Sequence, residues 1–77
     1  MNKILFFAHL RDEVGEESVQ IEVAGKTVAE VKAIVAEQYK VAKLDTAMTA
    51  INEEFAPNEE VIQDGDIIAF IPPVSGG

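Results

Sequence analysis

The stretch Ile67-Ile68-Ala69-Phe70-Ile71-Pro72-Pro73-Val74-Ser75-Gly76-Gly77 is the part of the sequence that most limits the fold. Its first five residues are β-branched, aromatic or small, which predicts a strand, and a turn-forming segment at residues 63–66 stands before them. Pro72 and Pro73 end this strand, because proline lacks the N–H group that a sheet ladder needs. The chain therefore closes with a strand and a short segment without signs of regular structure.

The beginning of the chain predicts two further strands. Residues 3–10 are rich in Ile, Leu and Phe and carry no helix-ending signal, so we expect a strand that is apolar on both faces. Residues 18–23 alternate polar and apolar side chains, which predicts a half-buried strand with Val19, Ile21 and Val23 facing inward. A turn over residues 11–17 would join the two strands into a hairpin.

One helix is predicted over residues 27–39. Thr27 and Glu30 have the spacing of a capping box, in which each side chain accepts a hydrogen bond from a free backbone N–H group at the helix start. The apolar residues of one helix side are Val28, Val31, Ile34, Val35 and Tyr39. The charged residues expected to point into water are Glu30, Lys32, Glu37 and Lys40.

A fourth strand is expected at residues 48–51, followed by a turn at residues 52–54 and a loop at residues 56–58 that leads to Val61 and Ile62. The order β-β-α-β-β predicts an α+β fold of the ubiquitin-like β-grasp class, with a mixed sheet and one main helix on one face. Because 77 residues support a single hydrophobic core, we expect one domain over residues 1–72 and a flexible tail over residues 73–77.

Composition limits the classes of function. Cysteine is absent, so we expect no disulfide, and a reducing, cytoplasmic setting fits. The apolar run at residues 4–8 is too short to span a bilayer, which argues against a membrane protein. A net charge of −8 argues against nucleic acid as a partner. The acidity either keeps the protein soluble or steers it to a basic partner.

The first and last strands are apolar on both faces, although one helix can cover only one face of a sheet. Alternate residues of the two strands should face the helix, and the residues between them should project from the opposite face. The inward set is Ile4, Phe6, Ile68 and Phe70, and the outward set is Leu5, Phe7, Ala69 and Ile71. The outward set is either covered by loops or exposed for a partner.

Catalysis by side chains has little support in the sequence. His9 is the one histidine, cysteine and tryptophan are absent, and Ser18 and Ser75 have no base in a recognisable pattern. The acidic pairs at residues 16–17, 53–54 and 59–60 fall in predicted turns, where solvated charges are far commoner than metal ligands. We therefore expect no metal site.

The closing segment offers another way to act. Its prolines stiffen the base toward polyproline II, and its glycines lack the Cβ atom that would block a narrow channel. Residues 72–77 could reach roughly 20 Å at about 3.3 Å per residue. Such a tail could bring the α-carboxyl group of Gly77 into the active site of another protein, or it could simply be a frayed end.

With these features the sequence resembles the small subunit of molybdopterin synthase. The resemblance rests on residues 4–8 with Arg11, on residues 50–52, on residues 64–66 and above all on residues 69–77. One departure is Ile71, where the family often has a second aromatic residue. The resemblance implies an apolar patch, with Arg11 at its rim, that docks a large synthase subunit. The implied partner-binding residues are Leu5, Phe7, Arg11, Ile71, Pro72, Pro73, Val74 and Ser75.

The resemblance also implies a cycle in which Gly77, preceded by Gly76, is the reacting residue. An ATP-dependent activating enzyme would convert the Gly77 carboxylate into an acyl-AMP, and sulfur would replace AMP to give a thiocarboxylate. In the family, the large subunit uses this sulfur to build the molybdopterin dithiolene on a cyclic pyranopterin monophosphate. The carrier would hold no permanent cofactor and would not be a catalyst by itself.

Three other functions stay open. A thiamine-pathway sulfur carrier also ends in Gly-Gly, but it is usually shorter and lacks a lead-in like residues 72–75. A ubiquitin-like modifier would use the same terminus to form isopeptide bonds. A plain β-grasp binding domain would leave the tail idle.

Overall fold

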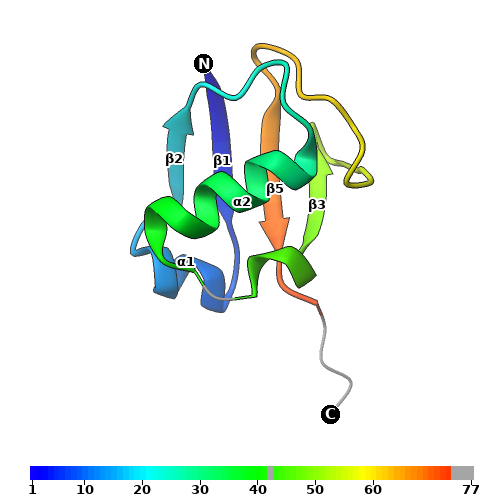
Figure 1. The fold of residues 1–77 in the computed structure, drawn as a ribbon. Helices are drawn as coiled ribbons and strands as arrows, with labels where there is room; N and C mark the ends of the chain where they lie inside the picture. Colours follow the sequence, from blue (N-terminus) through cyan, green and yellow to red (C-terminus); the bar gives the residue numbers. More distant parts are fainter. Residues whose placement is uncertain (42, 74–77) are drawn as a thin grey trace.

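The computed structural model describes residues 1–41 and 43–73. Its elements are β1 (Asn2–Phe6), α1 (His9–Val14), β2 (Ser18–Ile21), α2 (Val28–Tyr39), the 3₁₀ turn η1 (Leu44–Thr46), β3 (Met48–Ile51), β4 (Glu54–Phe55) and β5 (Ile67–Ile71). The strands form one sheet in the order β2-β1-β5-β3-β4, in which β1 and β5 are parallel and all other neighbours antiparallel. α2 crosses one face of this sheet (Figure 1). The arrangement is the predicted β-grasp fold, with the first and last strands side by side.

The core lies between α2 and the centre of the sheet. Ile4 pairs with Ile68 and Phe6 with Phe70 across the parallel ladder, and none of these four side chains is more than 2% exposed. The ring of Phe6 lies 6.3 Å from that of Phe70 and 6.4 Å, edge to face, from that of Tyr39. The helix contributes Val28, Val31 and Val35, all buried. The predicted inward set is therefore confirmed.

The start of α2 is the predicted capping box. Thr27 Oγ1 accepts a hydrogen bond from the backbone N–H of Glu30 at 3.2 Å, and Glu30 Oε1 accepts one from the backbone N–H of Thr27 at 2.8 Å. The bond from the Thr27 backbone is the main reason why the pKa of the Glu30 carboxyl is lowered. Two donors that the helix leaves free are thus satisfied at its first turn.

The strand predicted over residues 3–10 is wrong beyond Phe6. The backbone of Ala8 has φ 52° and ψ −135°, which turns the chain into α1, and the N–H of Leu10 donates to the carbonyl of Phe7 at 3.1 Å. Leu10 then packs into the core at 2% exposure. The turn predicted over residues 11–17 is therefore helical in its first part. Likewise, the turn predicted at residues 52–54 is shorter, because Glu54 already belongs to β4.

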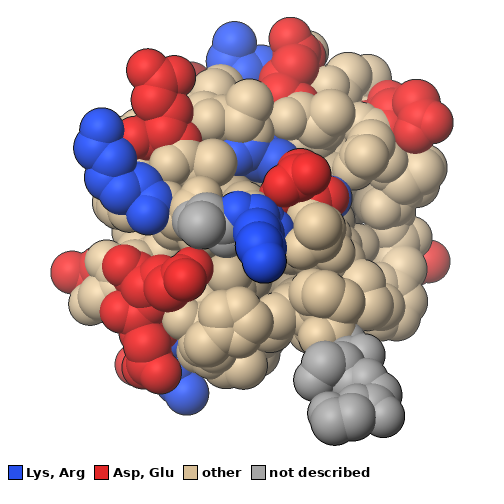
Figure 2. All heavy atoms as spheres, turned by 60° about the horizontal axis from the view of Figure 1, so that its bottom comes forward, with Lys and Arg blue, Asp and Glu red and all other residues tan. Residues whose placement is uncertain are grey.

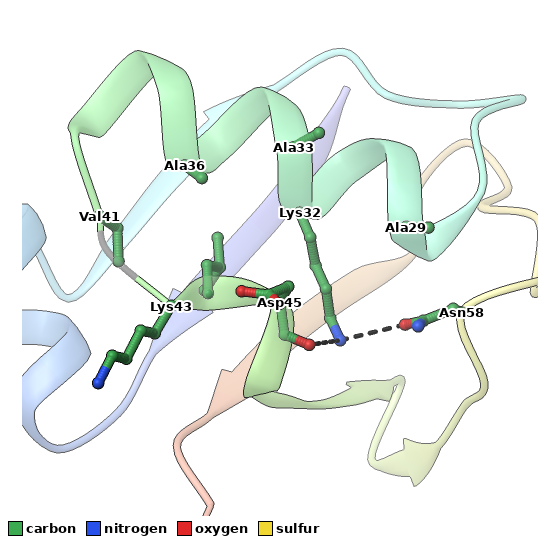
Figure 3. A pocket seen from close by; sticks show the side chains of 9 residues that line it. Ala29, Lys32, Ala33, Ala36, Val41, Lys43, Asp45 and Asn58 are labelled. Carbon is green, nitrogen blue, oxygen red and sulfur yellow. Dashed lines mark hydrogen bonds between the residues drawn. The ribbon is translucent and has the colours of Figure 1, made fainter.

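The prediction that Lys32 points into water is also wrong. Its side chain, 7% exposed, runs from α2 toward η1 and the loop before β5 (Figure 3). Its ammonium group donates to the carbonyl of Ala47 at 2.8 Å, to Asn58 Oδ1 at 3.1 Å and to the carbonyl of Asp45 at 3.4 Å. Desolvation by burial lowers the pKa of Lys32. This lysine ties three segments that are far apart in the sequence.

Asn2 makes a similar tie at the other end of the sheet. Its side chain is 1% exposed, and its amide group donates to the carbonyls of Gln63 at 2.8 Å and Asp66 at 3.0 Å. These bonds hold the turn that leads into β5.

Within residues 1–41 and 43–73, the helices lack the length and apolar character that a bilayer crossing requires.

Replacing Lys32 by methionine should destabilise the fold. The change keeps an apolar stem but leaves the buried carbonyl of Ala47 and its neighbours without their donor, so the free energy of unfolding should fall by about 1–3 kcal/mol. Urea unfolding would measure this difference. Lys26→Met, at an exposed position, is the matched control. An unchanged midpoint for the Lys32 variant would contradict the structural role of its hydrogen bonds.

The stability that depends on Lys32 should also change with pH. Because its pKa is lowered by burial, the unfolded chain binds this proton more tightly than the folded one at pH values just below the ordinary 10.5. The free energy of unfolding therefore rises with pH in that range. We expect the wild type to gain stability over Lys32→Met as the pH rises toward the ordinary pKa of lysine. A difference that stays constant across this range would disprove the linkage.

Candidate functional site

The sheet face opposite α2 is apolar. Its outward side chains form rows across the strands, because residues paired in a ladder point to the same side. In the central row, Leu5 pairs with Ala69, Ala69 with Ala50, and Ala50 with Phe55. In the next row toward the chain end, Ile71 pairs with Met48. Four strands thus contribute to one continuous apolar surface, which we call the outer face.

The outer face is open to solvent. It contains a hollow of about 550 Å³. The hollow is lined by Leu5, Phe7, Ala50, Asn52, Glu53, Phe55, Ile67, Ala69 and Ile71. The largest of these side chains are well exposed, with 71% for Phe55, 45% for Phe7 and 42% for Ile67. Among the described residues, loops therefore do not cover this face, and the predicted outward set lies on it.

Arg11 stands at the border of the outer face, as predicted, although it comes from α1 rather than from a turn. It lines a neighbouring hollow of about 330 Å³ together with Lys3, Leu5 and Phe7. Its guanidinium group lies 3.5 Å from the carboxylate of Glu17, and both side chains are more than half exposed. Such exposed ion pairs hold a side chain only weakly. Arg11 therefore stays free to turn toward a partner.

The base of the predicted tail adjoins the outer face. β5 ends at Ile71, at the end of the sheet where α1 and η1 lie, and the chain leaves the sheet through Pro72 and Pro73 (Figure 1). A hollow of about 570 Å³ lies beside these prolines. Phe7 and Ile71 line this hollow as well as the one on the outer face. One apolar surface therefore runs from the sheet to the point where the tail begins.

Charged side chains are unevenly placed at this end of the molecule. In Figure 2 most of them lie over the left, central and upper parts of the view, and the lower right part is mostly uncharged. The hollow at the tail base contains His9 and Lys43 but no acidic residue. The predicted site residues Val74, Ser75, Gly76 and Gly77 lie outside the described residues. Their roles stay predictions.

Sequence reasoning missed Phe55, the most exposed large apolar side chain of the described chain. It lies on β4, a strand of two residues, which is too short to show an alternating pattern. The signal that could have found it is Asn52, because asparagine tolerates the left-handed conformation that a tight hairpin turn requires. A hairpin of that register places Phe55 beside Ala50.

The arrangement is suited to binding a protein partner. In residues 1–41 and 43–73, no three His, Asp or Glu side chains lie close enough together to hold a metal ion. The outer face offers aromatic and aliphatic anchors with a basic side chain at one border, which is the composition of a protein interface.

Comparison with known proteins agrees with this architecture. Residues 4–77 match the ThiS family. The molybdopterin synthase sulfur carrier subunit of Haemophilus influenzae is 35% identical, and the alignment covers 100% of both chains. SAMP1 of Haloferax volcanii is 29% identical with a TM-score of 0.79, over 99% of this chain and 98% of that one. A chain in the complex of subunits 1 and 2 of the Helicobacter pylori molybdopterin-converting factor is 28% identical with a TM-score of 0.68, over 99% and 97%.

These matches confirm the resemblance seen in the sequence. The family match begins in β1, includes the whole outer face and continues past β5 to the last residue. The alignment with the Haemophilus protein likewise reaches both ends of the two chains. The chain belongs to the ThiS family, and within it the chain is a homologue of the molybdopterin synthase sulfur carrier subunits.

Proposed function

We propose that this chain is the sulfur carrier subunit of a molybdopterin synthase and that it carries sulfur as a thiocarboxylate on Gly77. The observation that carries the proposal is the full-length match to the Haemophilus carrier subunit, which includes the terminal Gly76 and Gly77. The open outer face beside the base of the tail supports the docking of a larger protein. The Helicobacter complex of two converting-factor subunits supports the large synthase subunit as that protein.

Loading with sulfur would begin with activation of the carboxyl group. A carboxylate is a poor electrophile, so an ATP-dependent activating enzyme must first improve it. The Gly77 carboxylate attacks the α-phosphorus of ATP, and pyrophosphate leaves. Sulfur at the oxidation level of hydrosulfide then attacks the carbonyl carbon, and AMP leaves with the electrons of the broken C–O bond. Dividing the exchange into two steps lets each have a good leaving group.

Delivery of the sulfur would take place in the large subunit. The thiocarboxylate sulfur attacks an oxygen-bearing carbon of a cyclic pyranopterin monophosphate, and the displaced oxygen leaves with the electrons of the broken C–O bond. Water then cleaves the acyl–sulfur bond. The Gly77 carboxylate is restored, and the sulfur stays on the pterin. A dithiolene contains two sulfur atoms, so each molecule of product consumes two carriers that have been loaded with sulfur. The catalytic side chains belong to the large subunit. A cytoplasmic location suits this cycle, because activation consumes ATP and the chain contains no cysteine.

The outer face would aim the tail. Phe7 and Ile71 border both the outer face and the hollow beside Pro72 and Pro73, so a partner that covers the face also contacts the base of the tail. Residues 74–77 would then begin at a fixed position relative to the partner. Correct placement of a reacting group is a large part of rate enhancement, and an error of about 1 Å can lower a rate about a hundredfold.

A second candidate function is covalent attachment to other proteins. It is favoured by the likeness to SAMP1, since the Haloferax protein is described as a small archaeal modifier protein. Both functions share the acyl-AMP and separate afterwards. Incubation with an activating enzyme, ATP and a sulfur source distinguishes them by mass spectrometry. A carrier gains the mass of one oxygen-to-sulfur exchange, whereas a modifier becomes joined to lysine side chains.

Truncating Phe7 should weaken docking without unfolding the domain. Its ring is 45% exposed at the centre of the apolar surface. An anchor of this kind contributes about 2 kcal/mol or more, so Phe7→Ala should raise the dissociation constant for the large subunit about thirtyfold. Titration calorimetry would measure it. Val61→Ala, at 44% exposure and away from the outer face, is the control. Unchanged binding by a folded Phe7→Ala would remove the outer face from the interface.

The tail should require both glycines. Deleting Gly77 moves the reacting carboxyl group by about 3.3 Å. Gly76→Val adds a branched side chain to the tail, and the passage that leads the tail into the active site of the large subunit should be too narrow for it. Molybdopterin formation should be lost in both variants, and Ser75→Ala should be nearly as active as the wild type. All three should melt like the wild type, because β5 ends at Ile71. A reconstituted assay with the activating enzyme, a sulfur donor and the large subunit tests this. Full activity of the Gly77 deletion would end the carrier hypothesis.

A further inference from the structure

We propose that Glu53 determines the specificity of docking on the outer face, because its carboxylate pairs with a lysine or arginine of the large synthase subunit. The inference rests on the proposed function, which supplies that partner. The backbone of Glu53 has a left-handed conformation that a glutamate adopts only at a cost. Glu53 also lines the hollow of the outer face.

Glu53 occupies a turn position that favours glycine. The β3–β4 hairpin is closed by the pair Ile51 and Glu54, with Asn52 and Glu53 as its two turn residues. Their φ angles are 51° and 72°, which is the left-handed conformation of a type I′ turn. Asparagine tolerates this conformation, but the Cβ atom of a glutamate crowds the backbone there. The usual second residue of such a turn is glycine.

The turn cannot shift to relieve Glu53, because Asn52 is held at three points. The N–H of Asn52 donates to the carbonyl of Ile67 at 2.8 Å, and Asn52 Oδ1 accepts from the N–H of Ile67 at 3.0 Å. Its amide group also donates to Asp66 Oδ1 at 2.9 Å. The side chain of Asn52 thus continues the β3–β5 ladder by one step. Whatever residue follows Asn52 must accept the left-handed conformation.

No ion pair within the described chain offsets this strain. The Glu53 side chain is exposed, and among residues 1–41 and 43–73 no lysine or arginine lies within 4.0 Å of its carboxylate. It is, however, the one charged residue that lines the hollow of the outer face. A strained residue that lines an open apolar surface and has no ion pair inside the molecule points to a contact outside it.

The charges at the borders of the outer face differ in sign. Glu53 stands at the β3–β4 end, whereas Lys3 and Arg11 line the adjoining hollow on the β1 side, where Glu17 lies 3.5 Å from Arg11. A partner with a cation opposite Glu53 fits best in one orientation, because the reversed orientation would place that cation against Lys3, which has no ion pair within residues 1–41 and 43–73. Like charges brought together oppose the wrong arrangement. The pair would therefore select both the partner and its orientation.

Two substitutions of Glu53 separate charge from strain. Glu53→Gln keeps the shape and the strain, so its melting temperature should be unchanged. Its association rate with the large subunit should fall about threefold at low salt and match the wild type at about 0.5 M salt, where the charges are screened. Glu53→Gly should bind as weakly as Glu53→Gln yet melt about 4 °C higher, because the strain is gone. Stability and binding then move in opposite directions.

Two controls match these changes. Glu54→Gln removes the neighbouring carboxylate, which lines a different hollow with Ala56 and Glu60, and should bind like the wild type. Lys40→Gly relieves the same kind of strain at the end of α2, where φ is 58°, and should raise the melting temperature with unchanged binding. Stopped-flow association and thermal melts give both readouts.

The outcomes are distinct. If the wild type binds the large subunit and Glu53→Gln associates as fast as Glu54→Gln at low salt, the role of Glu53 is wrong and the proposed function stands. If the wild type does not bind the large subunit, the proposed partner is wrong and this inference falls with it. A slower, salt-dependent association of both Glu53 variants, with normal Glu54→Gln, supports the pair.

Discussion

The parallel pairing of β1 with β5 is the interaction on which the rest of the structure depends. It brings the two ends of the sequence to the centre of the sheet, so that Phe6 lies beside Phe70 in the core and Leu5 beside Ala69 on the outer face. Parallel strands cannot be joined by a tight turn, and the intervening chain therefore has to cross over the sheet. α2 makes this crossing and covers one face, which leaves the opposite face open.

Residues 1–41 and 43–73 form no second layer that covers this open face. The apolar side chains there are a liability for an isolated protein and an advantage for a subunit that works inside a complex. Their position also matters for the chemistry. β5 supplies the middle of the outer face and continues directly into Pro72 and Pro73. Under the proposed function, docking of the outer face and placement of the tail would therefore be one event.

Polar side chains hold the ends of the elements in place. Asn2 bonds to the turn before β5, Asn52 extends the ladder between β3 and β5, and Lys32 joins α2 to the carbonyls at the end of η1. Each satisfies backbone groups that the helix and sheet ladders leave without partners. These ties fix the borders of the outer face, and at Glu53 the fixed turn forces a strained conformation.

The sequence by itself determined the main helix, the principal strands and the outward side of β1 and β5, because these signals are local. A capping box at Thr27 and Glu30, alternation along a strand and a stop at two prolines each involve neighbouring residues. The tertiary structure decided the fates of Leu10, Lys32 and Glu53. Lys32 is buried because the fold places carbonyls from 13 and 15 residues further along the chain beside its ammonium group. Glu53 is strained because Ile67 holds the preceding turn residue, Asn52, in place by a hydrogen bond. Contacts between distant segments leave no trace in a local pattern, so only the folded chain could reveal them.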